Sequence, residues 1–194
     1  MSLRIEQDGR LLRITLAAPE RRNVLDAALS EHLLREISEA EENPATGAIL
    51  IDAEGPMFCG GIDPASPPTA ELFTVGQRAT KPIVVAVKGA AVSAGLALIA
   101  NAHVAIAAQG STFGFIDIRE GRWNEDVFQS LASAIGRRRA LELALTGRIF
   151  STADAASWGL IHMVAPAFEL EDRASDVAIA LANADGEVVR AALK

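Results

Sequence analysis

Hydrophobic and polar positions alternate, cluster or recur at helical spacing in different parts of the chain. Residues 3–7 and 11–16 alternate apolar and polar side chains around Asp8 and Gly9, which predicts a β-hairpin. Continuously apolar runs, typical of strands buried on both faces, occupy residues 48–51, 83–87 and 104–107. A fourth strand is expected over residues 161–164.

Helical spacing is clearest over residues 25–42, where Leu29, Leu33 and Ile37 recur on one face and Asp26 is placed to cap the start. Further helices are expected over residues 69–79, 94–101, 125–135, 137–146, 151–159 and from 169 onward. Residues 55–68 hold four of the eight prolines and predict a long irregular loop.

The order of these elements predicts the fold class. A hairpin, then buried strands alternating with helices, then mostly helix, indicates an α/β fold with a largely parallel sheet covered by helices. The 194 residues are expected to form one domain, with a core over about 1–166 and a helical tail over about 167–194.

Composition narrows the function classes. With 18 Lys+Arg against 25 Asp+Glu, the formal net charge of −7 argues against nucleic-acid binding. The single cysteine, Cys59, excludes an intrachain disulfide and favours a reducing compartment. The most apolar stretch, residues 89–100, is too short to span a membrane, and no signal peptide is visible, so a soluble cytoplasmic protein is expected. The three histidines show no metal-ligand spacing.

Two segments rich in glycine and small residues follow buried strands: residues 58–63 and 89–95. Ligands of open α/β folds gather at the carboxyl ends of parallel strands, and small residues there let a ligand approach the backbone. Free N–H groups in such turns can bind a developing oxyanion. Spacing alone leaves two tight turns made of small residues as the alternative.

Residues 58–63, Phe-Cys-Gly-Gly-Ile-Asp, resemble the Phe-Cys-Ala-Gly-Ala-Asp signature of the crotonase (enoyl-CoA hydratase/isomerase) superfamily. Residues 19–25 are similar to the family's Pro-x-x-x-Asn-Ala-Leu, and residues 80–89 to its Lys-Pro-Val-Ile-Ala-Ala-Val-Asn-Gly. Residues 145–166 resemble its second half. Each piece is weak alone, but their order along nearly the whole chain makes a strong case.

The resemblance implies a spiral of ββα units with surrounding helices, shortened at its C-terminal helical part, that binds acyl-CoA thioesters of the kind met in fatty acid metabolism. It places the two oxyanion-hole N–H groups on Ile62 and Ala94. It places contacts to coenzyme A, which enters as part of the substrate with no separate cofactor and no metal, on Arg21, Arg22, Val24 and Gly60. It also implies a homo-oligomer, a trimer or a dimer of trimers.

The chain departs from the family where hydratases carry two glutamates. The first position is Ala97, which cannot transfer a proton, and the second is Asp117, which keeps a shorter carboxylate. Glu125 falls near a further acid of the family's dienoyl-CoA isomerases, or it sits at a helix N-terminus for electrostatic reasons. The chain also ends at Lys194, where relatives continue into helices that cover the site.

Three functions remain open. The favoured one is an acyl-CoA enzyme in which Asp117 moves a proton through a thioester enolate, with isomerase chemistry preferred over hydration. The second is a catalytically attenuated acyl-CoA-binding homologue. The third is a serine hydrolase: residues 91–95 resemble a nucleophile elbow around Ser93, and Asp117 and His162 follow in order. Against it, four residues separate Val87 from Val92, whereas an elbow turns sharply off its strand.

Overall fold

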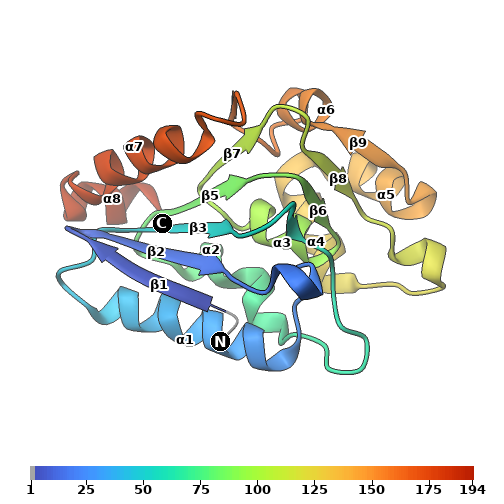
Figure 1. Ribbon diagram of the computed structural model, residues 1–194, viewed down its shortest axis with the longest axis horizontal. Coiled ribbons are helices and arrows are strands. Elements are labelled where there is room, and N and C mark those ends of the chain that lie inside the picture. The colour runs from blue at the N-terminus through green and yellow to red at the C-terminus, as the bar shows by residue number, and fades with distance from the viewer. Residues whose placement is uncertain (1–2) are drawn as a thin grey trace.

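The structure, a computed structural model, describes residues 3–194 and holds two β-sheets (Figure 1). The larger sheet has the order β1-β2-β3-β5-β7-β10, and its neighbours run parallel except in the β1–β2 hairpin. Its strands are β1 (Leu3–Asp8), β2 (Leu11–Leu16), β3 (Ala48–Ala53), β5 (Ile83–Val87), β7 (Val104–Ala108) and β10 (Met163–Ala165).

The smaller sheet has the order β4-β6-β8-β9. Its strands are β4 (Met57–Cys59), β6 (Ala90–Val92), β8 (Thr112–Gly114) and β9 (Ile149–Ser151). The first three are parallel neighbours, and β9 runs antiparallel to β8. This mixed α/β architecture agrees with the predicted fold class.

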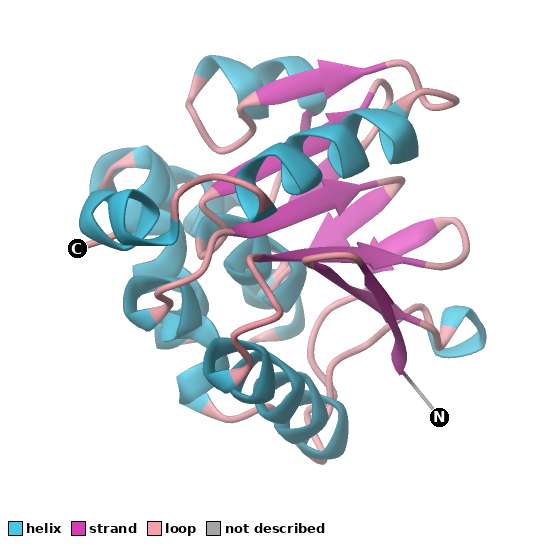
Figure 2. Ribbon diagram, turned by 90° about the vertical axis from the view of Figure 1, so that its left-hand side faces the viewer, coloured by secondary structure: helices cyan, strands magenta, loops and turns pink. Residues whose placement is uncertain are grey.

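Helices cover both faces of the larger sheet (Figure 2). The α-helices are α1 (Ala27–Glu42), α2 (Val75–Arg78), α3 (Ala94–Ala100), α4 (Glu125–Ile135), α5 (Arg137–Thr146), α6 (Thr152–Ser157), α7 (Leu170–Ala182) and α8 (Gly186–Ala192). Three short 3-10 helices are η1 (Pro19–Arg21), η2 (Ala70–Thr74) and η3 (Asp117–Glu120). Among residues 3–194, no helix combines the length and the apolar character needed to cross a membrane.

Burial on both faces explains the apolar runs. In β3, Ile49 and Ile51 join the core that contains α1 and α3, while Leu50 between them joins the second core beneath α7. Successive side chains of a strand point to opposite faces, so a strand covered on both sides needs apolar residues at every position. The prediction from the sequence is confirmed there.

Several boundaries also agree with the predictions. The hairpin forms as expected, and α4 and α5 have the predicted bounds. The side chain of Asp26 accepts the N–H of Leu29 at 2.8 Å and so caps α1, which begins at Ala27 rather than at residue 25.

Other expectations were wrong. Residues 55–68 are not one irregular loop, because β4 lies within them. The last strand of the larger sheet is Met163–Ala165 rather than 161–164, since the ring of His162 accepts the N–H of Ala105 and takes the place of a regular strand bond. The strands β4, β6 and β9 have three residues each, too few to show a period.

Gly89 joins β5 to β6 and lets the smaller sheet form. Its φ is +75°, and a Cβ built there would lie 1.8 Å from the backbone oxygen of Pro56, just before β4. Only glycine allows both the backbone conformation and the close approach of the two chain segments.

We expect Gly89→Ala to destabilise the protein far more than Gly110→Ala. Gly110 also has a positive φ, +82°, but apart from its chain neighbours no heavy atom of the described residues lies within 4 Å of a Cβ built there. The control should cost about 1–2 kcal/mol for the left-handed backbone alone. Gly89→Ala adds a steric clash of about 1–3 kcal/mol. Urea unfolding of both variants measures the difference, and equal losses would contradict a close β4–β6 contact at Gly89.

Candidate functional site

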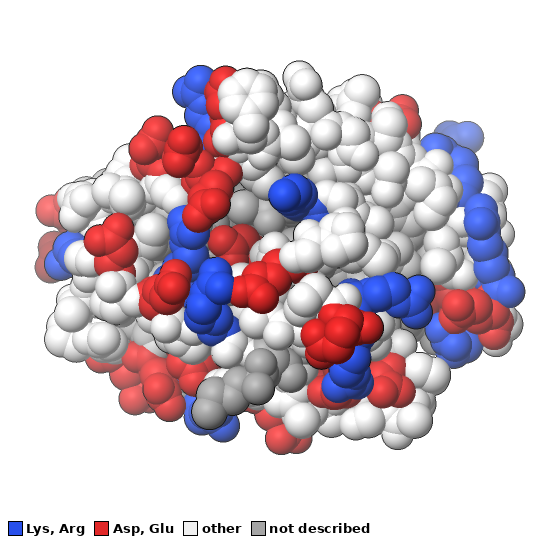
Figure 3. Space-filling view, in the orientation of Figure 1, with Lys and Arg blue, Asp and Glu red and all other residues white. Residues whose placement is uncertain are grey.

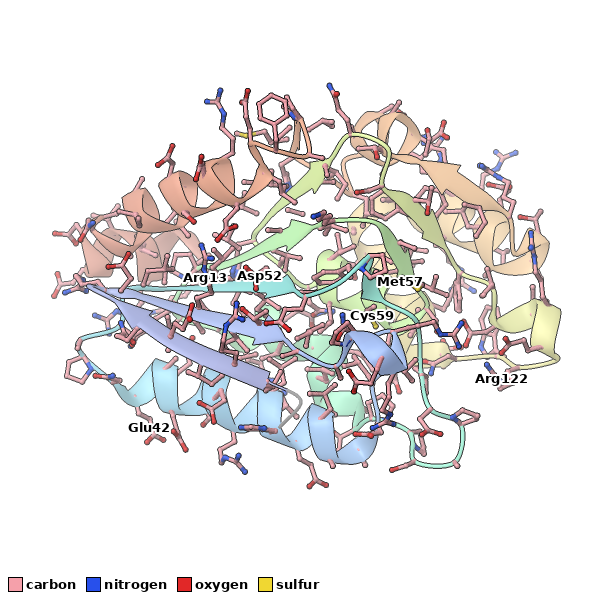
Figure 4. All side chains as sticks on the ribbon, viewed as in Figure 1. Arg13, Glu42, Asp52, Met57, Cys59 and Arg122 are labelled. Atoms are coloured by element: carbon pink, nitrogen blue, oxygen red, sulfur yellow. The ribbon has the colours of Figure 1, made fainter. Side chains whose placement is uncertain are left out.

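Three turns meet at one edge of the smaller sheet. Because β4, β6 and β8 are parallel neighbours, the segments after their carboxyl ends lie side by side. These segments border a cavity of about 330 Å³. It is lined by Arg22, Val24, Gly60, Gly61, Ile62, Asp63, Pro64, Val92, Ser93, Ile116, Asp117, Glu120 and Arg122. Figure 4 shows Met57 and Cys59 of β4 near the centre of the view and Arg122 nearer its edge.

The first turn, after β4, exposes the N–H of Ile62. Leu25 donates to the backbone oxygen of Gly61 at 2.9 Å and accepts the N–H of Asp63 at 2.9 Å. In such a parallel bridge the intervening Ile62 directs its own N–H away from Leu25. Within residues 3–194 that N–H has no acceptor. Gly61 adopts φ +118°, which gives the turn its shape.

The second turn, between β6 and α3, carries the N–H of the buried Ala94. Ser93 there has φ 47° and ψ −107°, an uncommon conformation for a residue with a side chain. Ala94 is the first residue of α3, where a helix has no acceptor of its own for the N–H, and the described part of the chain supplies none. A Cβ built on Gly61 would lie 3.8 Å from the Cβ of Ser93, so the two turns are in contact.

The third turn, after β8, carries the carboxylate of Asp117. This side chain is buried at the start of η3, and its Oδ2 has no hydrogen-bond partner among the described residues. A buried carboxylate oxygen without a partner is costly, and such atoms in native structures indicate strain, a bound molecule or function. Ile62 and Asp117 therefore line the same cavity, and Ala94 directly follows Ser93 of that lining.

Asn23 holds the first turn in place from the other side. It is fully buried, its φ is +51°, and its side chain makes three backbone hydrogen bonds of 2.9 Å: it accepts the N–H of Ala18 and donates to the backbone oxygens of Glu54 and Met57. These bonds tie the segment around η1 to the start of β4 and to the residues just before it. The backbone oxygen of Arg22 in turn accepts the N–H of Gly60 at 2.8 Å.

Three of the four residues predicted to contact coenzyme A lie together at the cavity. Arg22, Val24 and Gly60 line the cavity. Arg21 lies beside it, with its guanidinium 3.0 Å from a carboxylate oxygen of Asp26 and 3.6 Å from one of Asp63. The guanidinium of Arg22 has no carboxylate within 4.0 Å in the described part of the chain. On the face shown in Figure 3, acidic and basic side chains are intermixed.

Glu125 lies outside the cavity lining. It is exposed at the start of α4, where it accepts hydrogen bonds from Trp123 at 2.8 Å and from Gln129. The Gln129 and Trp123 hydrogen bonds lower the pKa of its carboxyl. The structure does not bring this acid together with Asp117.

Ala97 and Cys59 belong to the packing around the site. Both are fully buried, and Ala97 offers no polar atom beyond its backbone. Burial raises the pKa of the Cys59 thiol to about 11, so at neutral pH it is a small packed side chain rather than a nucleophile. Asp63 stabilises its own turn by accepting the N–H of Ala65 at 2.9 Å.

The serine-hydrolase arrangement is only half present. β6 ends directly before Ser93, so the four residues between Val87 and Val92 do not by themselves argue against an elbow there. The Oγ of Ser93, however, is buried and has no partner among the described residues, so no serine–histidine hydrogen bond exists there. Nδ1 of His162 accepts the N–H of Ala105 instead.

The sequence reasoning missed other lining residues, above all Ile116, Glu120 and Arg122 around Asp117. They lie on η3 and beside it, in a segment without a clear period. Their only signal was their closeness in sequence to Asp117. Arg122 forms an ion pair with Glu120.

The chain is also similar to known proteins of one family. Residues 6–194 match the profile of the enoyl-CoA hydratase/isomerase family. The chain is 29% identical to mevalonyl-coenzyme A hydratase sidH of Aspergillus fumigatus, over 95% of this chain and 73% of that protein. It is 31% identical to the probable enoyl-CoA hydratase echA8 of Mycobacterium tuberculosis, over 97% of this chain and 78% of the relative. The enoyl-CoA hydratase structure from Mycobacterium avium superposes with a TM-score of 0.88 at 30% identity, covering 100% of this chain and 86% of the other.

We expect Asn23→Ala to lower the free energy of unfolding by about 3 kcal/mol, because it leaves two buried backbone oxygens and one N–H unpaired. Alanine also tolerates the positive φ poorly. Urea denaturation measures the loss. Asn23→Asp is the control: it keeps the acceptor for Ala18 but loses both donors, so it too should destabilise. A loss below about 1 kcal/mol for Asn23→Ala would show that these bonds do not hold the turn.

Proposed function

The chain belongs to the enoyl-CoA hydratase/isomerase family. We propose that it binds an acyl-CoA thioester and acts on it as follows. The thioester oxygen of the substrate accepts hydrogen bonds from the N–H groups of Ile62 and Ala94. Coenzyme A enters as part of the substrate. The observation that carries the proposal is that Ile62, whose N–H has no acceptor in the described part of the chain, and Asp117 line one cavity, with the N–H of Ala94 directly after Ser93, which also lines it.

The two N–H groups stabilise an enolate. Removing a proton from the carbon beside a thioester moves negative charge onto the oxygen, and donors already aimed there stabilise that charge without reorganising. One such donor contributes on the order of 3 kcal/mol to the transition state. Because both donors are backbone groups, the side chains of Ile62 and Ala94 have little influence on this step.

Asp117 moves the proton. Its carboxylate, which lines the cavity, accepts a proton from one carbon of the acyl chain and returns it to another, which shifts a double bond. One carboxylate is enough for this reaction, whereas hydration by two acids lacks its second acid at Ala97. We therefore propose isomerase-type chemistry as the main activity. The absence of an acid at position 97 also favours a second candidate, a binding homologue with little turnover.

Arg22 supplies a cation for the phosphates of coenzyme A. The protein as a whole is acidic, so a polyanionic ligand must be held by local positive charge. The exposed Arg22 lines the cavity and, within residues 3–194, is not neutralised by an ion pair, unlike Arg21. Its planar donors suit phosphate oxygens.

Asp117→Asn tests the catalytic step. We expect the conversion of 3-butenoyl-CoA to crotonyl-CoA to fall by about 100-fold or more, the usual contribution of a positioned acid or base. Affinity for crotonyl-CoA, measured by calorimetry, should persist. Glu125→Gln is the matched comparison and should leave the rate within about twofold, since its carboxylate is outside the cavity. A wild-type protein that binds crotonyl-CoA without turnover would identify the binding homologue instead.

Arg22→Ala and Arg21→Ala test the coenzyme A contact. We expect Arg22→Ala to weaken crotonyl-CoA binding by about tenfold, because a phosphate loses a charged hydrogen bond. Arg21→Ala removes a side chain already paired with Asp26 and should have the smaller effect. The Arg22 effect should shrink as salt is added, because salt screens exposed charges. Calorimetric titration of each variant with crotonyl-CoA at two salt concentrations measures these changes in affinity. Equal losses of affinity in the two variants would remove Arg22 from the proposal.

A further inference from the structure

Four arginines border a second cavity, which shares no lining residue with the candidate functional site. This cavity has a volume of about 660 Å³. It is lined by Ile135, Gly136, Arg137, Arg138, Arg139, Glu142, Arg148 and Trp158. Arg137, Arg138 and Arg139 are exposed, and within residues 3–194 none of them has a carboxylate within 4.0 Å. Positive charge is therefore concentrated at one place in a chain whose formal net charge is −7.

The position of these arginines in the fold is electrostatically unfavourable. Residues 137–139 form the first turn of α5, where the positive end of the helix dipole favours acidic side chains and disfavours basic ones. Lys81 shows the favourable arrangement, because its ammonium donates to the backbone oxygens of Ala40 and Asn43 at the end of α1. Neighbouring like charges also repel one another. The helix itself therefore does not account for three arginines at its start.

Trp158 and Glu142 hold two of the guanidinium groups in place. Trp158 ends α6, which lies in the same part of the molecule as α5 (Figure 1). The guanidinium carbon of Arg139 lies 4.6 Å from the centre of the Trp158 ring, and that of Arg148 lies 5.4 Å from it. Arg148 also donates to Glu142 from Nε at 2.7 Å and from Nη2 at 3.0 Å. These contacts orient the two planar groups before any ligand binds, which lowers the entropic cost of binding.

The acids near the cluster do not neutralise it. Glu142 is the single acid in the cavity lining, against four arginines, and it is already paired with Arg148. The carboxylate of Asp154 accepts the N–H and the hydroxyl of Ser151 at 3.1 and 2.8 Å. Arg138 has neither an aromatic ring nor a carboxylate beside its guanidinium in the part of the chain that the structure describes. The cavity thus retains an excess of positive charge on exposed side chains.

We propose that this cavity binds a compact polyanion through a diphosphate group. The planar donors of arginine match phosphate oxygens, and several of them together bind adjacent phosphates. The acidic chain as a whole repels an extended polyanion, whereas a compact one can be held by local charge. Because the arginines are exposed, such a ligand reaches them directly. The proposal does not depend on the proposed function, since the two cavities have no residue in common.

The two tryptophans of the chain allow a local test. In the full chain, Trp123→Phe leaves Trp158, which contacts Arg139 and Arg148, as the one tryptophan that fluoresces. We expect sodium diphosphate to change the emission of this variant in a saturable manner. The affinity should fall as salt is added, because salt screens exposed charges. A parallel titration with ADP identifies the source of the diphosphate: tighter binding of ADP indicates a nucleotide, and equal binding indicates that the diphosphate alone is recognised.

Arg138→Ala in the same background tests the arginines. We expect diphosphate to bind about tenfold more weakly, because charge-assisted hydrogen bonds to a phosphate are lost. Arg138→Lys keeps the charge but not the planar donors, so its affinity should lie between the two. Arg35→Ala is the matched control: it removes the same charge from α1 and should leave the affinity within about twofold. Thermal unfolding of each variant shows whether the fold is retained, and Arg138 makes no ion pair or ring contact whose loss would destabilise the described fold.

Four results would overturn the proposal. The first is the lack of a saturable change in Trp158 emission at millimolar diphosphate. The second is an equal loss of affinity in Arg138→Ala and Arg35→Ala, which would show an effect of net charge alone. The third is equal affinity for sulfate, which would show surface charge without a diphosphate site. The fourth is a loss in Arg22→Ala but not in Arg138→Ala, which would place the bound diphosphate at the candidate functional site. The first three leave the proposed function standing, and the fourth supports its coenzyme A contact.

Discussion

The parallel pairing of β4, β6 and β8 is the constraint on which the candidate site depends. It places three turns, separated by tens of residues in the chain, at one edge of a small sheet. The pairing itself depends on a close backbone contact, since Gly89 leaves no space for a Cβ beside Pro56. A similar contact follows at α3, where a Cβ on Gly95 would lie 3.0 Å from the Cβ of Cys59.

Much of the larger sheet could be predicted from the sequence, because the residues that determine each element lie within it or next to it in the chain. The residues of β3 and β5 are apolar at every position, and Asp26 directly precedes the helix that it caps. The strands β4, β6 and β9 were missed because three residues cannot show a period, and their partners are distant in sequence. Contacts between such strands depend on tertiary structure, which a pattern of residue types does not contain.

The candidate site, like the fold, could be predicted from the sequence only in part. The residues around Ile62, Ala94 and Asp117 were located through resemblance to a family, not through periodicity. Neither the contact between Gly61 and Ser93 nor the unpaired oxygens could be read from the sequence, because both depend on backbone angles and on what surrounds each atom. Resemblance to a family can also suggest a residue that lies elsewhere. The position of Glu125 in the sequence suggested an active-site acid, whereas its side chain accepts hydrogen bonds from Trp123 and Gln129 at the surface.

The segment that carries Arg22 is also the segment that supports the first turn. Its backbone oxygen accepts the N–H of Gly60, and Leu25 bonds on both sides of Ile62. A phosphate held by Arg22 would therefore act on a segment that is hydrogen-bonded to the residues on both sides of Ile62, the proposed oxyanion donor. Interactions with a remote part of a substrate can accelerate a reaction when they fix the reacting groups in place. Under the proposed function, the nucleotide end of an acyl-CoA and its thioester would be bound by two chain segments that backbone hydrogen bonds join, so binding at one end would help to order the donor at the other.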